Sequence, residues 1–352
     1  MLAVSLGVDE RLFATPSERR MLRAIEQGLD EVETGLLGEL AFGDTLADTT
    51  SRYLFEAGGK RVRPALALLT AQLGNGVTPE VVRAAQAVEL THLASLYHDD
   101  VMDEAVLRRG VASAHQVWGN SVAILTGDLL FARASVIIAS LGSRALELQA
   151  RTFERLVLGQ LHETVGPSPT DDPVDHYVQV LADKTGSLIT LAGLVGLIFS
   201  EASDAYYPAI AGFGERVGVA FQLVDDVIDI TDASQTTGKA PGTDLRAGVP
   251  TMPLLLLQRD AASDETAAAL VARIDATADE DDAAADPAER AKRDEAFLAA
   301  VAELRAHPAT ERTLAEARRW ADAAIAALDP IPAGPIKRAL AEFAERTVER
   351  DS

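Results

Sequence analysis

The chain has 352 residues, of which 48% are apolar and 24% charged, and it contains no cysteine. This composition is typical of a folded globular protein, and the absence of cysteine excludes a disulfide scaffold, a thiolate metal site and a cysteine nucleophile. The formal net charge of −22 argues against nucleic-acid binding through a broad basic surface.

No secretory signal or membrane span stands out in the sequence. Residues 1–12 carry acidic and basic side chains directly after a short apolar run, which is not the pattern of a signal peptide. The uncharged run at residues 185–200 is shorter than the roughly 20 residues that a spanning helix needs. We expect this run to be a buried core helix and the protein to be cytoplasmic.

The placement of proline predicts a helical chain. No proline occurs between residues 79 and 167 or between 208 and 241, and helices tolerate proline only in their first turn. Thr78-Pro79-Glu80 has the features of a helix start, and apolar residues then recur every three or four positions as far as residue 99. Residues 217–228 repeat this spacing, and alternating strand patterns are nearly absent, so we expect an all-α fold.

A basic segment precedes a helix that Pro64 is expected to open. Gly58-Gly59-Lys60-Arg61-Val62-Arg63-Pro64 places three cations beside a flexible glycine pair. Further bases follow at residues 108–109, 184 and 239. Arginine and lysine are the usual protein partners of phosphate groups. Any one of these bases on its own is better explained as a solvated surface charge, and it is their number in so acidic a chain that indicates phosphate binding.

The first acidic cluster is Asp99-Asp100-Val-Met-Asp103, at the end of the helix predicted from residue 79. Asp99 and Asp103 are one helical turn apart and share a face. Stacked carboxylates repel one another unless a cation lies between them, and oxygen ligands favour a hard cation such as Mg²⁺. A solvated acidic helix end is the alternative, and this one cluster does not decide between them.

A second copy of the pattern occurs at Asp225-Asp226-Val-Ile-Asp229, again after apolar residues. Two such clusters on apolar helices are not explained as solvated surface. Because Mg²⁺ commonly keeps waters and recruits substrate phosphates, the two clusters together predict a diphosphate bound through shared metal ions.

The ordered series of motifs resembles the trans-isoprenyl diphosphate synthases of the polyprenyl synthetase family. The resemblance runs from about residue 51 to 253 and rests on a set of short motifs in the family's order. These motifs are Gly58-Gly59-Lys60-Arg61-Val62-Arg63-Pro64, His92 with the first aspartate cluster, Arg108-Arg109-Gly110, Gly127-Asp128, Gly159-Gln160, Lys184-Thr185, Phe221-Gln222 with the second cluster, and Gly238-Lys239 with Gly242 and Asp244. The resemblance implies an all-α isoprenoid-synthase-type bundle around a deep central cavity, a single domain over residues 1–352, Mg²⁺ and a homodimer.

The resemblance also implies roles for individual residues. Asp99, Asp103 and Asp225 would bind Mg²⁺, and Asp100, Asp226 and Asp229 would support them. The contacts to the allylic diphosphate would be Arg108, Lys184, Thr185, Gln222 and Lys239. The isopentenyl diphosphate site would be formed by Lys60, Arg63, His92 and Arg109. Catalysis would depend on the two aspartate clusters together with Lys184.

One segment departs from the family pattern. Where the family commonly has Gly-Lys before Thr-x-Pro, this chain has Gly248-Val249-Pro250-Thr251-Met252-Pro253, so that Val249 replaces the lysine. Arg246 is a candidate replacement for the missing cation. The departure concerns details of diphosphate binding rather than the class of reaction.

The helix before Asp99 is expected to form the wall along which the product grows. Ala94 and Ser95, and Thr91 one turn earlier, are small, whereas a large aromatic residue there would stop growth early. About 30 Å of helix separates residues 79 and 99, enough for about six isoprene units of roughly 5 Å each. We therefore expect a product of about C35 to C50, the size of a quinone side chain. Close helix packing is the other explanation for these small residues.

Three alternatives to this function remain at the level of sequence. A geranylgeranyl diphosphate synthase would result if a side chain from another helix stopped growth sooner. A class I terpene cyclase, which is a lyase, would lack the Gly-Gly-Lys-Arg segment and the second aspartate cluster, and both are present here. A non-catalytic partner subunit would lack the aspartate clusters, but the chain could be the catalytic half of a heteromer.

Residues 260–303 form the only low-complexity region, rich in alanine and acids. Thirteen acidic residues stand against four basic ones in this region. We expect a solvated helical insertion or a mobile loop, with an acidic partner-binding surface as the alternative.

Overall fold

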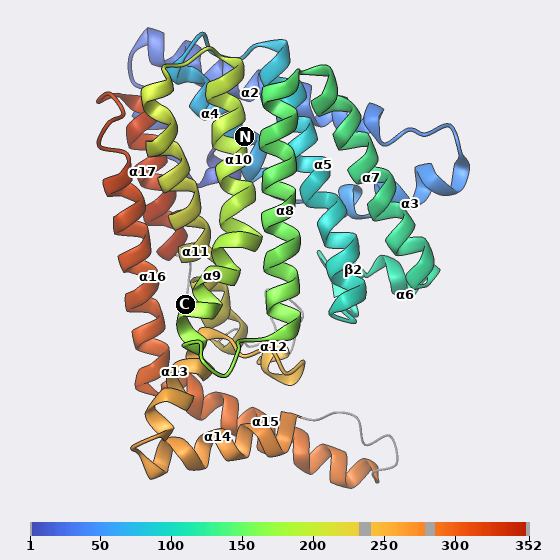
Figure 1. Ribbon diagram of the computed structural model, residues 1–352, viewed down its shortest axis with the longest axis vertical. Coiled ribbons are helices and arrows are strands. Elements are labelled where there is room, and N and C mark those ends of the chain that lie inside the picture. The colour runs from blue at the N-terminus through green and yellow to red at the C-terminus, as the bar shows by residue number, and fades with distance from the viewer. Residues whose placement is uncertain (1, 232–240, 279–285, 350–352) are drawn as a thin grey trace.

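The computed structural model describes residues 2–231, 241–278 and 286–349, and α-helices make up most of this part of the chain (Figure 1). Up to the first acidic cluster the elements are α1 (Leu2–Leu6), η1 (Glu10–Leu12), α2 (Pro16–Glu39), α3 (Thr45–Glu56), α4 (Val62–Thr70), η2 (Ala71–Leu73) and α5 (Pro79–Met102). Between the clusters follow β1 (Leu107–Arg108), β2 (Val111–Ala112), α6 (Ala114–Trp118), α7 (Asn120–Ser140), α8 (Ser143–Val165), α9 (Pro173–Leu181), η3 (Ala182–Gly186), α10 (Ser187–Phe199) and η4 (Asp204–Tyr206). The remaining elements are α11 (Tyr207–Thr231), α12 (Thr243–Arg246), α13 (Met252–Ala261), α14 (Glu265–Ala278), α15 (Pro287–Ala306), α16 (Pro308–Ala327) and α17 (Pro335–Val348).

The helix that carries the first acidic cluster, α5, begins where the sequence predicts. The side chain of Thr78 accepts a hydrogen bond from the backbone N–H of Val81, and Pro79 occupies the first turn. α5 packs against α2, α4, α7 and α10, and most of its side chains are buried on every side. The apolar neighbours of the first acidic cluster are therefore core residues.

The helix that carries the second cluster, α11, packs against α10 and α16. A Cβ atom added at Gly218 would lie 2.5 Å from Cα of Gly186, so these two glycines let the backbones approach closely. Gly186 ends η3, a π-helical turn that precedes α10. The run at residues 185–200 is a buried core helix, as predicted, except that it starts within this wider turn.

A two-residue hairpin directly follows α5, which the sequence did not predict. Leu107 pairs with Ala112 and Arg108 with Val111, in antiparallel register. The two turn residues, Arg109 and Gly110, have φ values of 54° and 79°, as a type I′ turn requires. The hairpin brings Arg108 and Arg109 back toward the end of α5.

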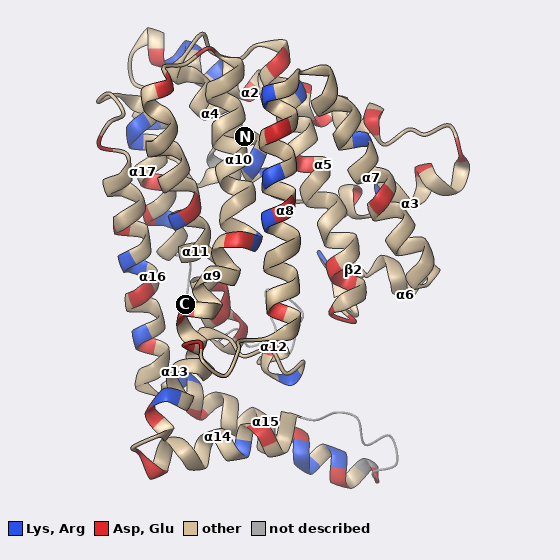
Figure 2. Cartoon of the chain, in the orientation of Figure 1, with Lys and Arg blue, Asp and Glu red and all other residues tan. Residues whose placement is uncertain are grey.

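The acidic region of residues 260–303 is helical where the structure describes it. α14 and α15 lie across one end of the bundle in Figure 1, and both pack against α13. Leu270, Ile274, Phe297 and Leu304 are buried in a core cluster distinct from the main one. Figure 2 shows acidic and basic residues together on α15. The acidic run at 279–282 lies outside the described residues.

Among the described residues, two stretches are long and apolar enough, by composition, to cross a membrane. Pro173–Phe199 is largely buried in the bundle, as a core helix is, whereas α7 leaves one face exposed. Buried core helices commonly meet the same length and hydropathy criteria, so these two are weak grounds for a membrane span.

Candidate functional site

The first acidic cluster lies at the C-terminal end of α5, where Asp103 takes the C-cap position. Asp99 is half-buried, and Asp103 is exposed one turn further along. Burial raises the pKa of the Asp99 carboxyl to about 6; the Lys184 ammonium opposes this shift and the Asp103 carboxylate adds to it. A bound cation would stabilise a half-buried acid that lies beside a second carboxylate.

Asp100, the middle residue of the first cluster, is engaged by the hairpin. Its side chain is fully buried, and Oδ1 accepts a hydrogen bond of 2.6 Å from Nε of Arg108 on β1. Oδ2 is also buried and has no hydrogen-bond partner in the described part of the chain. Burial raises the pKa of Asp100, while the Arg108 guanidinium opposes this shift. The side chain of Asp100 thus holds Arg108 rather than facing solvent.

The second cluster lies near the end of α11, and its middle residue is again the most buried. The Tyr177 hydroxyl lies 3.0 and 2.9 Å from the two carboxyl oxygens of Asp226 and donates to them, and the backbone N–H of Met252 donates to Oδ2 at 3.1 Å. Burial raises the pKa of Asp226 to about 8, and these hydrogen bonds oppose the shift. Met252 belongs to the segment that departs from the family pattern, so this segment contacts the cluster through its backbone.

The outer aspartates of the second cluster are more accessible. Asp225 and Asp229 are both half-buried. The backbone N–H of Asp244 lies 3.3 Å from Oδ2 of Asp229, and that of Gly242 lies 2.8 Å from the carbonyl oxygen of Asp229. The start of α12 therefore closes over Asp229. Gln222, one turn before Asp225 on α11, is half-buried.

Lys184 and Thr185 lie on the π-helical turn η3, between α9 and α10. Such turns interrupt the regular hydrogen-bond ladder and occur frequently at functional sites. Nζ of Lys184 forms an ion pair with Glu163 near the end of α8. The neighbouring Asp183 is fixed by Arg155 of α8, with Nη2 2.7 Å from Oδ1.

The pair formed by Lys184 and Glu163 lies within electrostatic reach of both clusters. Both side chains act on the pKa of Asp99. Burial raises the pKa of Tyr177 well above its usual value, and the carboxylates of Asp226 and Glu163 add to this shift. Figure 1 shows the C-terminal ends of α5 and α11 at the same end of the bundle. The structure thus brings the two predicted clusters to one region, with Lys184 near them.

Three of the four residues predicted for isopentenyl diphosphate gather in a basic group. Burial lowers the pKa of Arg63 to about 10, while Glu89 opposes the shift and Arg109 adds to it. Burial also lowers the pKa of His92 well below its usual value, and the nearby guanidinium groups of Arg63 and Arg109 add to that shift. His92 is therefore a neutral imidazole. Lys60, the fourth residue, is exposed in the preceding turn.

Ala94, Ser95 and Thr91, the residues predicted to line the product path, are all buried on α5. The sequence did not indicate Gln149 of α8, whose Nε2 donates a hydrogen bond of 2.8 Å to Oγ1 of Thr91. Oε1 of Gln149 is buried without a hydrogen-bond partner among the described residues. A polar side chain from a second helix therefore reaches the predicted wall.

Two predicted bases need separate comment. Lys239 lies outside the described residues. Arg246, the candidate replacement for the cation missing at Val249, is engaged by α15: its Nη1 lies 2.7 Å from Oδ1 of Asp294, and its guanidinium lies 4.3 Å from the ring centre of Phe297. In this structure Arg246 thus connects α12 to α15 of the acidic region.

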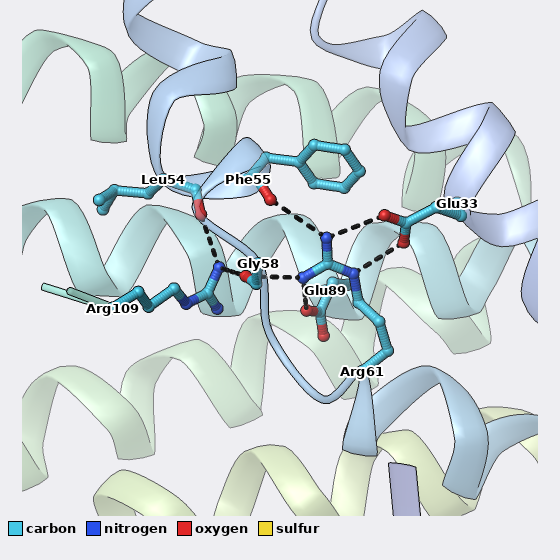
Figure 3. Close-up of polar contacts among 7 residues, drawn as sticks. All are labelled: Glu33, Leu54, Phe55, Gly58, Arg61, Glu89 and Arg109. Atoms are coloured by element: carbon cyan, nitrogen blue, oxygen red, sulfur yellow. Dashed lines mark hydrogen bonds and ion pairs between the residues drawn. The ribbon is translucent and has the colours of Figure 1, made fainter. Parts of the chain in front are cut away.

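Several supporting residues had no recognisable signal in the sequence. Tyr177 and Glu163 reach the clusters from α9 and α8, and only the fold brings them there. Arg61 belongs to the basic segment, but its partners Glu33 and Glu89 lie on α2 and α5 (Figure 3). Pairs so far apart in sequence are set by tertiary packing.

Comparisons with known proteins agree with this geometry. A family model described as polyprenyl synthetase matches residues 44–288. The nonaprenyl diphosphate synthase of Mycobacterium tuberculosis is 42% identical over 328 residues, which cover 93% of each chain. A polyprenyl synthase structure from Caulobacter crescentus, complexed with calcium and isoprenyl diphosphate, has a TM-score of 0.80 at 30% identity, covering 95% of this chain and 98% of that one. A geranylgeranyl pyrophosphate synthase structure from Corynebacterium glutamicum, also with calcium and isoprenyl diphosphate, has a TM-score of 0.77 at 38% identity, covering 96% and 98%.

Proposed function

Because the chain belongs to the polyprenyl synthetase family, we propose that it adds isopentenyl diphosphate repeatedly to an allylic diphosphate, as a long-chain trans-prenyltransferase. The observation that carries this proposal is the pair of aspartate clusters at one end of the bundle, with a basic group beside the first. Two negatively charged substrates need two sets of positive charge, one from metal ions and one from side chains. The single domain expected over residues 1–352 is part of the proposal.

The residues present fit a hard divalent cation. The two clusters offer only carboxylate oxygens, and Asp99 is a half-buried acid with a like-charged neighbour. Within residues 2–231, 241–278 and 286–349, no three acidic or histidine side chains are arranged as a metal site by themselves. This favours Mg²⁺ shared with a substrate diphosphate. Asp99, Asp103 and Asp225 would hold the metal, which when bound would stabilise the leaving diphosphate.

The allylic diphosphate would lie between the two clusters. Lys184 acts on Asp99 of the first cluster, and its ion-pair partner Glu163 acts on Tyr177 next to Asp226 of the second. Thr185 and Gln222 would offer neutral hydrogen-bonding groups. Arg108, held by Asp100, would add a cation from the hairpin, and Lys239 is expected to contribute another. Asp100, Asp226 and Asp229 would support the metal ligands by fixing Arg108, Tyr177 and α12. These cations stabilise the charge that develops as the allylic C–O bond breaks.

Isopentenyl diphosphate would be bound by Lys60, Arg63, His92 and Arg109. Two guanidinium groups supply charge, and the neutral imidazole of His92 supplies an N–H donor without adding to the local repulsion between cations. The isopentenyl double bond would attack the allylic carbocation. The proton released in this step would go to the departing diphosphate.

A product of about C35 to C50, the size of a quinone side chain, is supported by the small residues Ala94, Ser95 and Thr91. The similarity to a nonaprenyl diphosphate synthase agrees with this size. A geranylgeranyl diphosphate synthase is the second candidate, because Gln149 reaches the wall at Thr91 and because the chain is 38% identical to a structure with that name. A terpene cyclase fits less well, since the basic group would have no substrate.

We expect a homodimer in the cytoplasm. α7 and α8 expose a set of large apolar side chains, a pattern that indicates a protein interface rather than a solvated surface. These residues are Ile124, Leu125, Leu129, Val136, Leu146, Val157, Leu158, Leu161 and Val165. A different partner subunit could occupy the same face, which would make the chain the catalytic half of a heteromer.

The test is to incubate the purified protein with Mg²⁺, labelled isopentenyl diphosphate and farnesyl diphosphate and to measure the chain length of the products. A ladder ending near C35 to C50 is the expected result. A stop at C20 would support the geranylgeranyl alternative. A cyclised hydrocarbon formed without consumption of isopentenyl diphosphate would contradict the proposal.

A further inference from the structure

We infer that Arg61 does not bind substrate and is a positioning residue, which, together with Glu33, holds the Gly58–Gly59 turn so that Lys60 and Arg63 face isopentenyl diphosphate. Arg61 lies between these two residues in the sequence, and its charge alone would place it in the same group. The contacts of Arg61, however, differ from those of Lys60 and Arg63. The inference rests on the proposed function, because it concerns the substrate that the turn presents.

The guanidinium of Arg61 is bound on two sides by carboxylates from other helices (Figure 3). Nε and Nη2 lie 2.8 and 3.0 Å from the two carboxyl oxygens of Glu33 on α2, a bidentate pairing. Nη1 lies 3.5 Å from Oε1 of Glu89 on α5. The same guanidinium stacks 4.4 Å from the ring centre of Phe55. A bidentate and stacked arginine has a fixed orientation, and this one points toward α2.

Arg61 also binds the backbone that leads into the turn. Its Nη2 lies 3.3 Å from the carbonyl oxygen of Phe55, and its Nη1 lies 3.3 Å from that of Gly58. Arg109 donates to the carbonyl oxygens of Leu54 and Gly58. The two guanidinium groups thus satisfy carbonyls at and just beyond the end of α3, where a helix lacks its own donors.

The turn has a backbone conformation that needs such support. Gly58 and Gly59 have φ values of 102° and 142°, and Arg61 itself has a φ of 52°. A non-glycine residue in the left-handed region is uncommon and persists where its surroundings hold it there. Lys60 lies between the glycine pair and Arg61, and Arg63 follows two residues after Arg61. A change in the contacts of Arg61 would therefore move both.

Glu89 balances the basic group from within the core. Its side chain is buried, and Oε2 has no hydrogen-bond partner among the described residues. It is the carboxylate that opposes the pKa depression of both Arg63 and Arg109. Glu33 and Glu89 together offset two of the three guanidinium charges of Arg61, Arg63 and Arg109, which leaves the charge of one for an incoming anion.

The test compares Arg61→Lys, Glu33→Gln and the double variant by steady-state kinetics. Lysine keeps the charge but loses the bidentate pairing, and glutamine keeps the shape but loses the charge. We expect KM for isopentenyl diphosphate to rise about tenfold in Arg61→Lys and about threefold in Glu33→Gln, with kcat and KM for the allylic substrate within about twofold of wild type. The double variant should resemble Arg61→Lys alone, since both changes break one pairing.

Glu39→Gln is the matched control. Glu39 also lies on α2 and pairs with Arg83 of α5 at 2.5 Å and with Arg133 of α7 at 3.4 Å, away from the turn. Its loss should leave both KM values unchanged. Thermal unfolding of all variants separates a loss of fold from a loss of binding.

If Arg61 instead contacts the substrate directly, Glu33→Gln should not raise KM for isopentenyl diphosphate. If Arg61 bound the diphosphate, removing the competing Glu33 charge would lower KM for isopentenyl diphosphate or leave it unchanged, and either result would overturn the inference. Additive effects in the double variant would also overturn it. Failure of the wild-type protein to consume isopentenyl diphosphate would overturn the proposed function first, and this inference with it.

Discussion

The two aspartate clusters have the same spacing in the sequence but are supported differently in the structure. In the first cluster the middle aspartate, Asp100, pairs with the cation of Arg108. In the second the middle aspartate, Asp226, accepts hydrogen bonds from two neutral groups, the Tyr177 hydroxyl and the Met252 N–H. Identical motifs therefore do not imply identical electrostatics. The hairpin brings a base to the first cluster, whereas α9 and α13 enclose the second.

We expect substitutions of the outer aspartates to have the same effect on activity in both clusters. Asp99→Ala and Asp225→Ala each remove a proposed metal ligand, so we expect turnover to fall about a thousandfold or more in both, with the fold intact. Product formation and circular dichroism check this. If either variant keeps wild-type activity, the clusters do not act as a pair.

We expect the residues before the first cluster to line the product path and the residues before the second cluster not to line it. Ala94 and Ala220 each lie five residues before the first aspartate of their cluster, and both are fully buried. Ala94→Phe should shorten the product by several isoprene units, because it narrows the proposed path. Ala220→Phe should reduce stability or rate without changing the distribution of chain lengths. A shift in length from Ala220→Phe alone would place the path along α11.

The middle aspartates should differ in stability. Asp100→Asn leaves Arg108 without its carboxylate, so we expect the free energy of unfolding to fall by about 1–3 kcal/mol. Asp226→Asn keeps an oxygen acceptor and the shape of the side chain, so a loss of less than about 1 kcal/mol is expected. Urea unfolding without metal ions measures both. Equal losses would mean that the cationic partner does not distinguish the clusters.

The smallest effect is expected from the ion pair between α15 and α12, the helix next to the second cluster. Asp294→Asn weakens the pair with Arg246, which is partly exposed, so we expect a stability loss of about 0.5 kcal/mol and less than about a threefold change in rate. Unfolding and kinetics under the same conditions test this. A large loss of activity would show that the acidic region positions α12 for catalysis.

The sequence predicted the helices well because their signals are local. The cap at Thr78, the proline at 79 and the three- and four-residue spacing all lie within α5 itself. It did not predict the hairpin at residues 107–112, whose strands have only two residues each and whose turn includes a non-glycine residue with positive φ.

The candidate site could be predicted only where its residues recur in short motifs. Asp99, Asp225, Lys184 and Arg63 were identified in this way, and the structure brings the clusters and the basic group to their expected elements. Tyr177, Glu163 and Gln149 were missed, because each is an ordinary residue that acquires its neighbours through tertiary packing. The role of Arg61 was missed for the same reason: its motif shows that the residue is charged but not which way its side chain points.

The most direct test of the shared metal site is calorimetric titration of Mg²⁺ into the wild-type protein, Asp99→Ala and Asp225→Ala, each with and without a non-hydrolysable allylic diphosphate analogue. The account predicts strong Mg²⁺ binding by the wild type only when the analogue is present, and loss of that binding in both variants. Wild-type binding in either variant, or equally strong binding without the analogue, would contradict a metal shared between both clusters and the substrate.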